Sequence, residues 1–158
     1  MRFLLDGMLG SLTRWLRICG YDAEYIRDAE DDELIRRAIE EDRILLTRDR
    51  TLYRKALKMG LSAHFVEGES DVERLASVAH RFSLNLKPEG SRCPMCGSLL
   101  KEVGRNEVRG LVPEGTYKHY ERFWLCTCCG RVYWRGSHWR RIVETLEEAE
   151  RLYKGLEG

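Results

Sequence analysis

The sequence predicts an α/β chain in two parts: a parallel sheet with helices on both faces, then a small metal-bound module that ends in a helix. Three observations lead to this fold class. Short apolar runs alternate with single amphipathic segments over the first half, two Cys-x-x-Cys-Gly turns lie in the second half, and a polar stretch over 86–91 separates the two. We therefore expect one domain at 1–86 and another at 91–158.

The first half contains four short apolar runs, each followed by a segment with apolar residues at helical spacing. The expected strands are 2–5, 23–26, 43–47 and 63–66. The expected helices are 9–18, a segment that Asp31 or Asp32 caps and that runs to Ile39, then 52–59 and 72–82. Continuous apolar strands that alternate with helices are typical of a parallel sheet covered on both faces.

The second half is built differently. Strands are expected near 99–103, 119–125 and 131–134, with a loop rich in glycine and proline between the first two. A terminal helix is expected over 138–154, with a solvated acidic face in its later half. This pattern indicates a small sheet followed by one helix.

Two paired-cysteine turns, Cys93-Pro-Met-Cys96-Gly and Cys126-Thr-Cys-Cys129-Gly, are the strongest signal in the chain. Together they offer four thiolates in the tetrahedral arrangement that Zn²⁺ prefers, which predicts a structural zinc ribbon and not a catalytic metal site. Cys128, between two ligands, is expected to be a spare thiol, and Cys19 a thiol of the apolar core. A module this small would have a marginal core without its metal.

Charge is divided unevenly along the chain, although the formal net charge is only +1. Residues 1–85 carry fourteen Lys/Arg against sixteen Asp/Glu, whereas 87–141 carry eleven against five. No apolar run approaches the roughly 20 residues of a membrane span, and Asp6 interrupts the first apolar run almost at once, so we expect neither a membrane segment nor a signal peptide. Cysteines spaced for zinc favour a reducing, cytoplasmic compartment.

Acidic residues follow the predicted strands of the first half. Asp6 ends the first strand, Asp49 follows the third, and Asp31 and Asp32 open the helix between them. The working crevice of an open α/β sheet lies at the carboxyl ends of its strands, so these carboxylates are candidate ligands for Mg²⁺ or Mn²⁺. Such a site is typical of phosphodiester hydrolysis. Each residue also has a structural alternative: Asp6 in a turn, Asp31 as a helix cap, and Asp49 paired with a neighbouring arginine.

Basic and aromatic residues are candidates for RNA binding. Arginines next to the acidic positions could hold phosphates, and in the second half cations alternate with rings that could stack on unpaired bases. Phe123, Trp124 and Tyr133 are expected to pack the small core instead, and His138 to contact phosphate or cap the last helix. The candidate contacts are Arg14, Arg17, Arg48, Arg50, Arg135, His138 and Trp139.

Several motifs together resemble the Mut7-C RNase domain family. They are Leu5-Asp6-Gly7-Met8-Leu9-Gly10, Trp15-Leu16-Arg17, Gly20-Tyr21-Asp22, Leu46-Thr47-Arg48-Asp49-Arg50, the two cysteine turns, and the segment Tyr133-Trp134-Arg135-Gly136-Ser137-His138-Trp139. The resemblance implies a PIN-like nuclease fold with a C-terminal zinc ribbon. It implies Asp6, Asp31 and Asp49 as catalytic acids, with Asp32 as the fallback for Asp31. Many PIN enzymes use four acids, and Asp22 or Asp28 could supply the fourth.

Three functions fit these observations. The leading hypothesis is a metal-dependent endoribonuclease whose zinc ribbon helps to bind single-stranded RNA. The alternatives are a non-catalytic RNA- or ribosome-associated binding protein and a zinc-ribbon protein-interaction module. Cleavage that depends on Mg²⁺ or Mn²⁺ separates the first from the other two.

Overall fold

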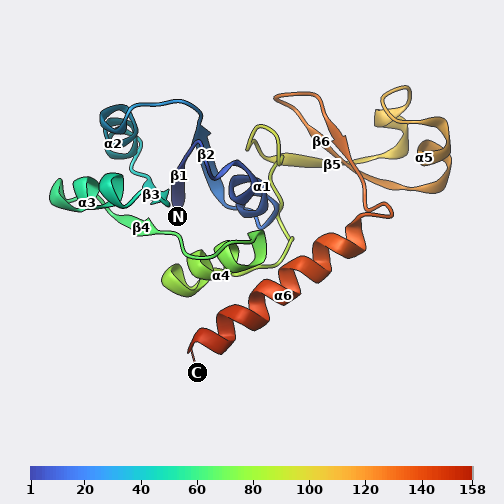
Figure 1. The fold of residues 1–158 in the computed structure, drawn as a ribbon. Helices are drawn as coiled ribbons and strands as arrows, with labels where there is room; N and C mark the ends of the chain where they lie inside the picture. The colour runs from blue at the N-terminus through green and yellow to red at the C-terminus, as the bar shows by residue number, and fades with distance from the viewer. Residues whose placement is uncertain (158) are drawn as a thin grey trace.

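The first half of the molecule is a four-stranded parallel sheet with its helices (Figure 1). The structure is a computed structural model and describes residues 1–157. Strands and helices alternate strictly in this half. They are β1 (Arg2–Asp6), α1 (Gly10–Ile18), β2 (Asp22–Ile26), α2 (Asp31–Glu40), β3 (Ile44–Thr47), α3 (Arg50–Lys58), β4 (Ala63–Phe65) and α4 (Asp71–Phe82).

The strand order in this sheet is β2-β1-β3-β4, and every neighbouring pair is parallel. In the register, Asp6 lies opposite Ile26 of β2, and Leu5 lies opposite Leu46 of β3. All four strands therefore end at one edge of the sheet. Because each strand leads into the next helix, that edge also holds the N-termini of all four helices.

Both faces of the sheet are buried by helices, as the sequence predicts. Side chains alternate along β1: Phe3 and Leu5 belong to one core cluster, and Leu4 belongs to another. The first cluster is closed by α1 and α4, and the second by α2 and α3. The apolar strands thus sit between two layers of helix.

The second half contains a three-stranded antiparallel sheet in the order β5-β6-β7. Its strands are β5 (Leu100–Gly104), β6 (Arg122–Cys126) and β7 (Val132–Tyr133). Val103, Val108 and Phe123 form its small buried core, so Phe123 packs as expected. Between β5 and β6 lie a short 3₁₀ helix, η1 (Arg105–Val108), and α5 (Glu114–His119).

The predicted strand over 119–125 begins too early. His119 is the last residue of α5, and β6 starts only at Arg122. The helix is only six residues long and none of its residues is buried. It therefore has no apolar face of its own, and periodicity could not reveal it.

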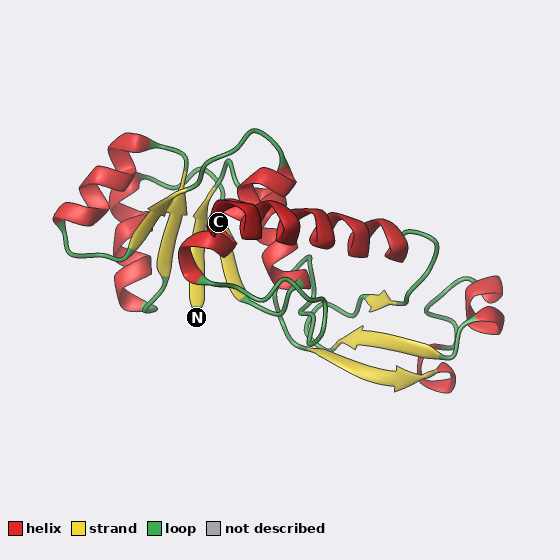
Figure 2. Cartoon of the chain, turned by 90° about the horizontal axis from the view of Figure 1, so that it is seen from below, coloured by secondary structure: helices red, strands yellow, loops and turns green. Residues whose placement is uncertain are grey.

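The terminal helix α6 (Trp139–Glu157) leaves the small sheet and packs back on the first half. Figures 1 and 2 show it running from the small sheet across to α4. Leu146 and Ala149 are fully buried in the same cluster as Phe3 and Leu5. The division at 1–86 and 91–158 stays a prediction, and α6 joins the two parts physically.

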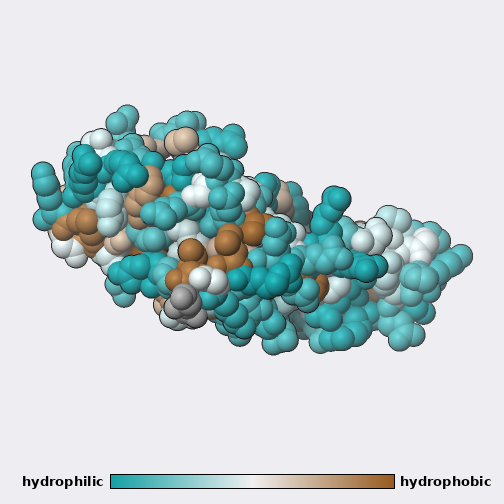
Figure 3. Space-filling model, turned by 60° about the horizontal axis from the view of Figure 1, so that its bottom comes forward, coloured by the Kyte–Doolittle hydropathy of each residue, from teal (hydrophilic) through white to brown (hydrophobic). Residues whose placement is uncertain are grey.

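The outward side of α6 is hydrophilic, as expected from its sequence. Glu144, Glu147 and Glu148 are exposed, and the surface in Figure 3 is mostly hydrophilic, with smaller apolar patches. Leu152 and Leu156 are the large exposed apolar side chains of this helix. In the part of the chain that the structure describes, no helix is both long enough and apolar enough to cross a membrane.

Candidate active site and cysteine metal centre

Asp6 is a buried carboxylate at the carboxyl edge of the parallel sheet. It is the last residue of β1 and its exposed fraction is 8%. The backbone N–H of Met8 donates to Asp6 Oδ1 at 3.0 Å, which stabilises the turn into α1. The turn expected from Asp6-Gly7 is therefore present. Buried carboxylates are rare without a cation partner, and the described chain places no Lys, Arg or His nitrogen within 4.0 Å of Asp6.

Thr47 links Asp6 to the loop that carries Asp49. The Thr47 hydroxyl donates to Asp6 Oδ2, and Thr47 Oγ1 itself accepts the backbone N–H of Asp49 at 3.0 Å. Thr47 is completely buried at the end of β3. Two residues that are distant in the sequence are thus tied to one hydroxyl group, a role of Thr47 that the sequence analysis missed.

Asp49 is the N-cap of α3 and does not pair with a neighbouring arginine. Its Oδ1 accepts the backbone N–H groups of Thr51 and Leu52, at 2.9 and 3.2 Å. A carboxylate at this position satisfies otherwise unpaired amides and interacts favourably with the helix dipole. The same interactions fix the carboxylate at the edge where β1 and β3 end.

Asp31 and Asp32 open α2, which follows the carboxyl end of β2 after the loop 27–30. Neither caps the helix, because the N-cap is Glu30 and it forms no side-chain capping bond. Asp32 is exposed and forms an ion pair with Lys55 of α3 at 2.5 Å. Asp31 is half-buried, and within residues 1–157 it forms no ion pair. Asp31 is thus the less engaged of the two carboxylates.

The carboxylates share an edge but do not converge on one point. Within residues 1–157, only the four cysteines bring three or more potential metal ligands within 4.8 Å of one another. Thr47 joins Asp6 to the Asp49 backbone, whereas Asp31 approaches from a separate helix. Carboxylate oxygens at this edge are the ligands that a hard divalent cation prefers. The carboxylates nevertheless lie apart and do not form a closed set of ligands.

The candidates for a fourth acid lie in very different places. Asp22 is at the start of β2, opposite Arg2, at the other edge of the sheet from Asp6. There it pairs with the buried Arg43 at 2.8 Å, so it cannot complete the acidic set. Asp28 lies in the loop after β2, with a positive φ of 58°.

Asp71 is a further carboxylate at the acidic edge, and it is not among the acids predicted from the sequence. It is the first residue of α4, and its Oδ2 accepts from Ser11 Oγ at 2.8 Å and Trp15 Nε1 at 3.4 Å. The signal was available, since Asp71 opens the helix after β4 just as Asp31 opens the helix after β2.

The four predicted cysteine ligands form one compact cluster. Their sulfur atoms all lie within 4.8 Å of one another, with 3.7 Å between Cys93 and Cys129 and 3.4 Å between Cys96 and Cys126. A tetrahedral ion with bonds of about 2.3 Å separates its sulfurs by roughly 3.8 Å. The cluster is therefore consistent with a zinc site. Cys128 is exposed and outside it, as expected.

The two cysteine turns share one backbone pattern. The carbonyl of Cys93 accepts the N–H of Gly97, and that of Cys126 accepts the N–H of Gly130. Both glycines have a left-handed backbone, with φ of 83° and 79°, which explains the glycine after each second cysteine. Each turn therefore presents its two sulfurs in the same way.

The groups around the sulfurs favour the thiolate form at Cys96 but not at Cys126. Hydrogen bonds from Ser98 lower the pKa of Cys96 to about 6, whereas burial raises the pKa of Cys126 to about 12. Tyr133, from β7, hydrogen-bonds Cys93 Sγ at 3.1 Å and supports the cluster from outside. Burial also raises the pKa of Cys19 to about 12, in keeping with a thiol of the core.

Comparison with known proteins decides the family. The model of the family described as "Mut7-C RNAse domain" matches residues 1–146, nearly the whole chain. The chain belongs to the Mut7-C RNase domain family. No curated protein and no solved structure matches the chain. The family implies a ribonuclease, and hence an RNA substrate.

Within this Mut7-C domain, the arginines near the acidic edge differ in how exposed they are and in how many contacts they already make. Arg14 and Arg50 are exposed, and the Arg50 guanidinium lies 4.2 Å from the centre of the Phe65 ring. Arg48 is more restrained, because it donates to the carbonyl of Val66 at 2.7 Å and pairs with Glu69.

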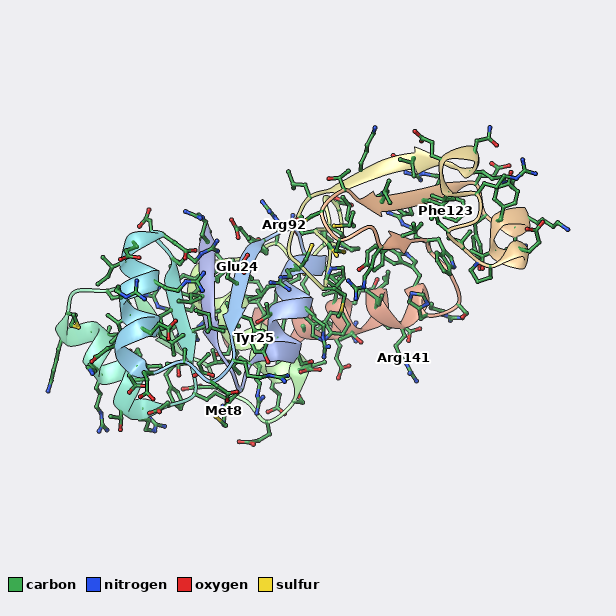
Figure 4. The ribbon with its side chains drawn as sticks, turned by 90° about the horizontal axis from the view of Figure 1, so that it is seen from above. Met8, Glu24, Tyr25, Arg92, Phe123 and Arg141 are labelled. Atoms are coloured by element: carbon green, nitrogen blue, oxygen red, sulfur yellow. The ribbon has the colours of Figure 1, made fainter. Side chains whose placement is uncertain are left out.

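Arg17 has a different role from the predicted RNA contact. It is buried in the Mut7-C domain, with an exposed fraction of 6%. Its guanidinium donates to the carbonyls of Ala23 at 2.8 Å and Pro94 at 3.1 Å. The Arg17 carbonyl in turn accepts the N–H of Arg92 at 2.8 Å. Figure 4 shows Arg92 at the junction between the two halves. Arg17 therefore joins α1 to the first cysteine turn, and its guanidinium is not available for RNA.

The aromatic residues of the second half lie on opposite faces of β6. Phe123 points into the small core, whereas the next residue, Trp124, is half-buried on the other face and pairs with Tyr133 of β7. Trp124 and Tyr133 instead line a cavity, and Arg135 and Trp139 also line it. The expectation that Trp124 and Tyr133 pack in the core is therefore wrong. Trp124 faces away from Phe123 because neighbouring strand residues face opposite sides, and Tyr133 lies opposite Trp124 in the register.

Proposed function

We propose that this protein is a metal-dependent endoribonuclease that hydrolyses phosphodiester bonds of single-stranded RNA. The observation that carries the proposal is the family match together with the position of Asp6, Asp31 and Asp49 at the carboxyl edge of one parallel sheet. Asp31 is preferred to Asp32 because Asp32 is already paired with Lys55.

The acids would hold Mg²⁺ or Mn²⁺, which prefer carboxylate oxygens. Such an ion would lower the pKa of a bound water and offset the charge that develops on the phosphate. Asp6 and Asp49 form the fixed part of the site, because Thr47 and the α3 amides hold them in place. Asp31 contributes from the first turn of α2.

Basic side chains near this edge would bind the RNA backbone. Arg14 and Arg50 are exposed, and Arg50 belongs to the helix that Asp49 caps. Their guanidinium groups can donate in pairs to phosphate oxygens and orient the strand over the acids. Arg48 would contribute less to phosphate binding, because one of its N–H groups already donates to the Val66 carbonyl.

We infer that the four cysteines hold a structural Zn²⁺. All four ligands come from the protein, so no position remains for substrate. The ion fixes the small sheet, and Arg135, His138 and Trp139 would contact RNA beside it.

The test is cleavage of a labelled single-stranded RNA by the full chain with Mn²⁺ or Mg²⁺. Asp6→Asn and Asp49→Asn should each lower the rate by about 100-fold or more, since each removes a charge from the metal site. Asparagine still accepts the amide bonds that cap α3, so the second variant keeps its fold. Thermal unfolding of both variants checks this.

The matched control is Asp42→Asn, which changes a carboxylate between α2 and β3, at the opposite edge of the sheet. It should cleave at the wild-type rate. A wild-type protein that cleaves no RNA with either ion, or an Asp6→Asn variant that cleaves normally, would refute the proposal.

A non-catalytic RNA-binding protein is the second candidate. It is favoured by one observation: over residues 1–157 no three carboxylates come within 4.8 Å, whereas in the second half the exposed Arg135 lies over the rings of Trp124 and Trp139. RNA binding that weakens as salt rises, without cleavage in any divalent ion, would support it.

A further inference from the structure

A cavity of about 220 Å³ lies where the two halves of the molecule meet. Its walls come from the linker, the small sheet, the end of α1 and the start of α6. Three of the four tryptophans of the protein line it, namely Trp124, Trp134 and Trp139. We propose that this cavity binds one unpaired base of the RNA, which rests on the proposed role of the protein in acting on RNA.

Arg135 places a flat guanidinium group over two of the rings that line the cavity. The guanidinium carbon of Arg135 lies 5.0 Å from the centre of the Trp124 ring and 4.6 Å from that of Trp139. Guanidinium groups and bases are both planar and both stack on aromatic faces. A base that replaces the guanidinium can therefore stack on these indoles, and Arg135 can then turn to the adjoining phosphate.

Three residues that line the cavity carry indole N–H donors that the protein does not use. Across residues 1–157, the indole N–H groups of Trp124, Trp134 and Trp139 have no hydrogen-bond partner, whereas that of Trp15 donates to Asp71. Unpaired bases present carbonyl and ring-nitrogen acceptors at their edges. Side chains suited to stacking and to edge contacts thus line the same cavity.

Size and charge favour a base over a peptide. The volume is below the roughly 300–1,000 Å³ of pockets that enclose larger organic ligands, so one ring system suits it. Two carboxylates line the cavity, Glu89 and Glu102, and Arg122 offsets the charge of Glu102 at 2.6 Å. Two arginines, Arg92 and Arg135, also line it, so the positive charge of the lining exceeds the negative. The surrounding residues 87–141 carry a balance of +6, which suits a phosphate backbone.

The position of the cavity relates it to the acidic edge. Ile18, the last residue of α1, lines the cavity, whereas the first turn of α1 follows Asp6. The helix has nine residues, so its ends are about 13 Å apart. A strand that occupies both sites must be several nucleotides long, and the cavity would hold a base away from the bond that is cut.

The test compares two oligomers on the zinc-loaded full chain without Mg²⁺ or Mn²⁺. One is a short single-stranded oligouridylate, and the other is its abasic counterpart, which keeps the ribose–phosphate backbone. Wild type should bind the oligouridylate about 10-fold more tightly, which is the range for one stacked base. The oligouridylate, but not the abasic oligomer, should also quench the tryptophan fluorescence.

Trp139→Ala should remove this difference between the two oligomers, whereas Trp139→Phe, which keeps a ring, should retain most of it. The charge control is Arg141→Ala, because the Arg141 side chain projects away from the small sheet in Figure 4. It should weaken the binding of both oligomers equally. Zinc content and thermal unfolding establish that each variant is folded.

Equal affinity of wild type for the two oligomers, with no difference in quenching, would overturn the inference and leave a peptide as the remaining occupant. So would a difference that survives in folded Trp139→Ala. Cleavage with Mn²⁺ is measured separately. A protein that distinguishes the oligomers but cuts no RNA would uphold the base pocket and refute the catalytic proposal.

Discussion

The hydroxyl group of Thr47 shows how one residue can organise the acidic edge. It is bonded to Asp6 Oδ2 and to the backbone N–H of Asp49, so it fixes the end of β1 relative to the start of α3. Sequence alone identifies the acids, because carboxylates follow apolar strands. It does not reveal Thr47, because a threonine that ends a buried strand is equally typical of β structure.

Asp22 provides a residue-scale prediction at the opposite edge of the sheet. Partial burial raises its pKa, but the hydrogen bond and charge of Arg43 outweigh this, so the net pKa is lowered. Asp22→Asn should therefore lower the free energy of unfolding by about 1–2 kcal/mol at neutral pH. RNA cleavage should stay at the wild-type rate, because Asp22 is not part of the acidic edge.

The difference in free energy of unfolding between wild type and Asp22→Asn depends on pH with a defined sign. The folded state favours the Asp22 carboxylate, so its contribution is present above the unfolded pKa near 3.9 and is lost as pH falls through the lower folded value. Urea unfolding of wild type and variant should thus give curves that converge at acidic pH. If the two free energies of unfolding differed by the same amount down to acidic pH, the ion pair between Asp22 and Arg43 would not be the cause of the difference.

Arg17 marks the limit of prediction from sequence at this scale. An arginine next to a candidate site suggests a phosphate contact, yet Arg17 is buried against Pro94, which lies 77 residues later in the chain. Periodicity places a side chain on a helix face, but it cannot tell which distant segment will cover that face. Arg14, on the same helix, remains exposed and available.

At the scale of elements, the two cysteine turns are the most predictable part of the molecule. Residue type, spacing and the following glycine each have a local physical reason, so the sequence suffices to identify all four cysteines of the cluster. The strands and helices of the first half are predictable for a similar reason, since apolar periodicity reflects burial. The short α5 was missed because it buries none of its residues.

Loss of one cysteine ligand should unfold the small sheet. Cys93→Ser leaves three thiolates and a weak donor, and the binding of structural zinc provides the folding free energy of such modules. We expect zinc to be lost and β5–β7 to unfold, as measured by metal content and by the fluorescence of Trp124 and Trp134.

Cys128→Ser is the matched control, because Cys128 is exposed and outside the cluster. It should retain one zinc ion per chain and the wild-type unfolding curve. Full zinc content in Cys93→Ser would instead show that the ligand assignment is wrong.

At the scale of the whole molecule, α6 makes the two halves interdependent. The helix starts beside the small sheet, where Trp139 lines the cavity, and its middle packs on α4. Arg17 and Arg92 bridge the halves at a second place. The sequence indicates a linker between two units, but it gives no sign that the last helix returns to the first, since its apolar stripe would fit either partner.

This packing gives the last prediction. Leu146 has an exposed fraction of 2% and lies in the cluster that contains Phe3 and Leu5. Leu146→Ala should lower the free energy of unfolding of the first half by about 2–4 kcal/mol, because it leaves a cavity between α6 and α4. Zinc content should not change, since the cysteine cluster is built from other elements.

Leu152→Ala is the control, because it makes the same substitution on the same helix at a side chain that is 40% exposed. Leu152→Ala should lower the free energy of unfolding by less than about 1 kcal/mol. Thermal unfolding followed by far-ultraviolet circular dichroism measures both variants. If Leu146→Ala lowered only a zinc-dependent transition and spared the parallel sheet, α6 would belong to the metal-bound unit alone. The cavity between the halves would then lack the fixed wall that base binding requires.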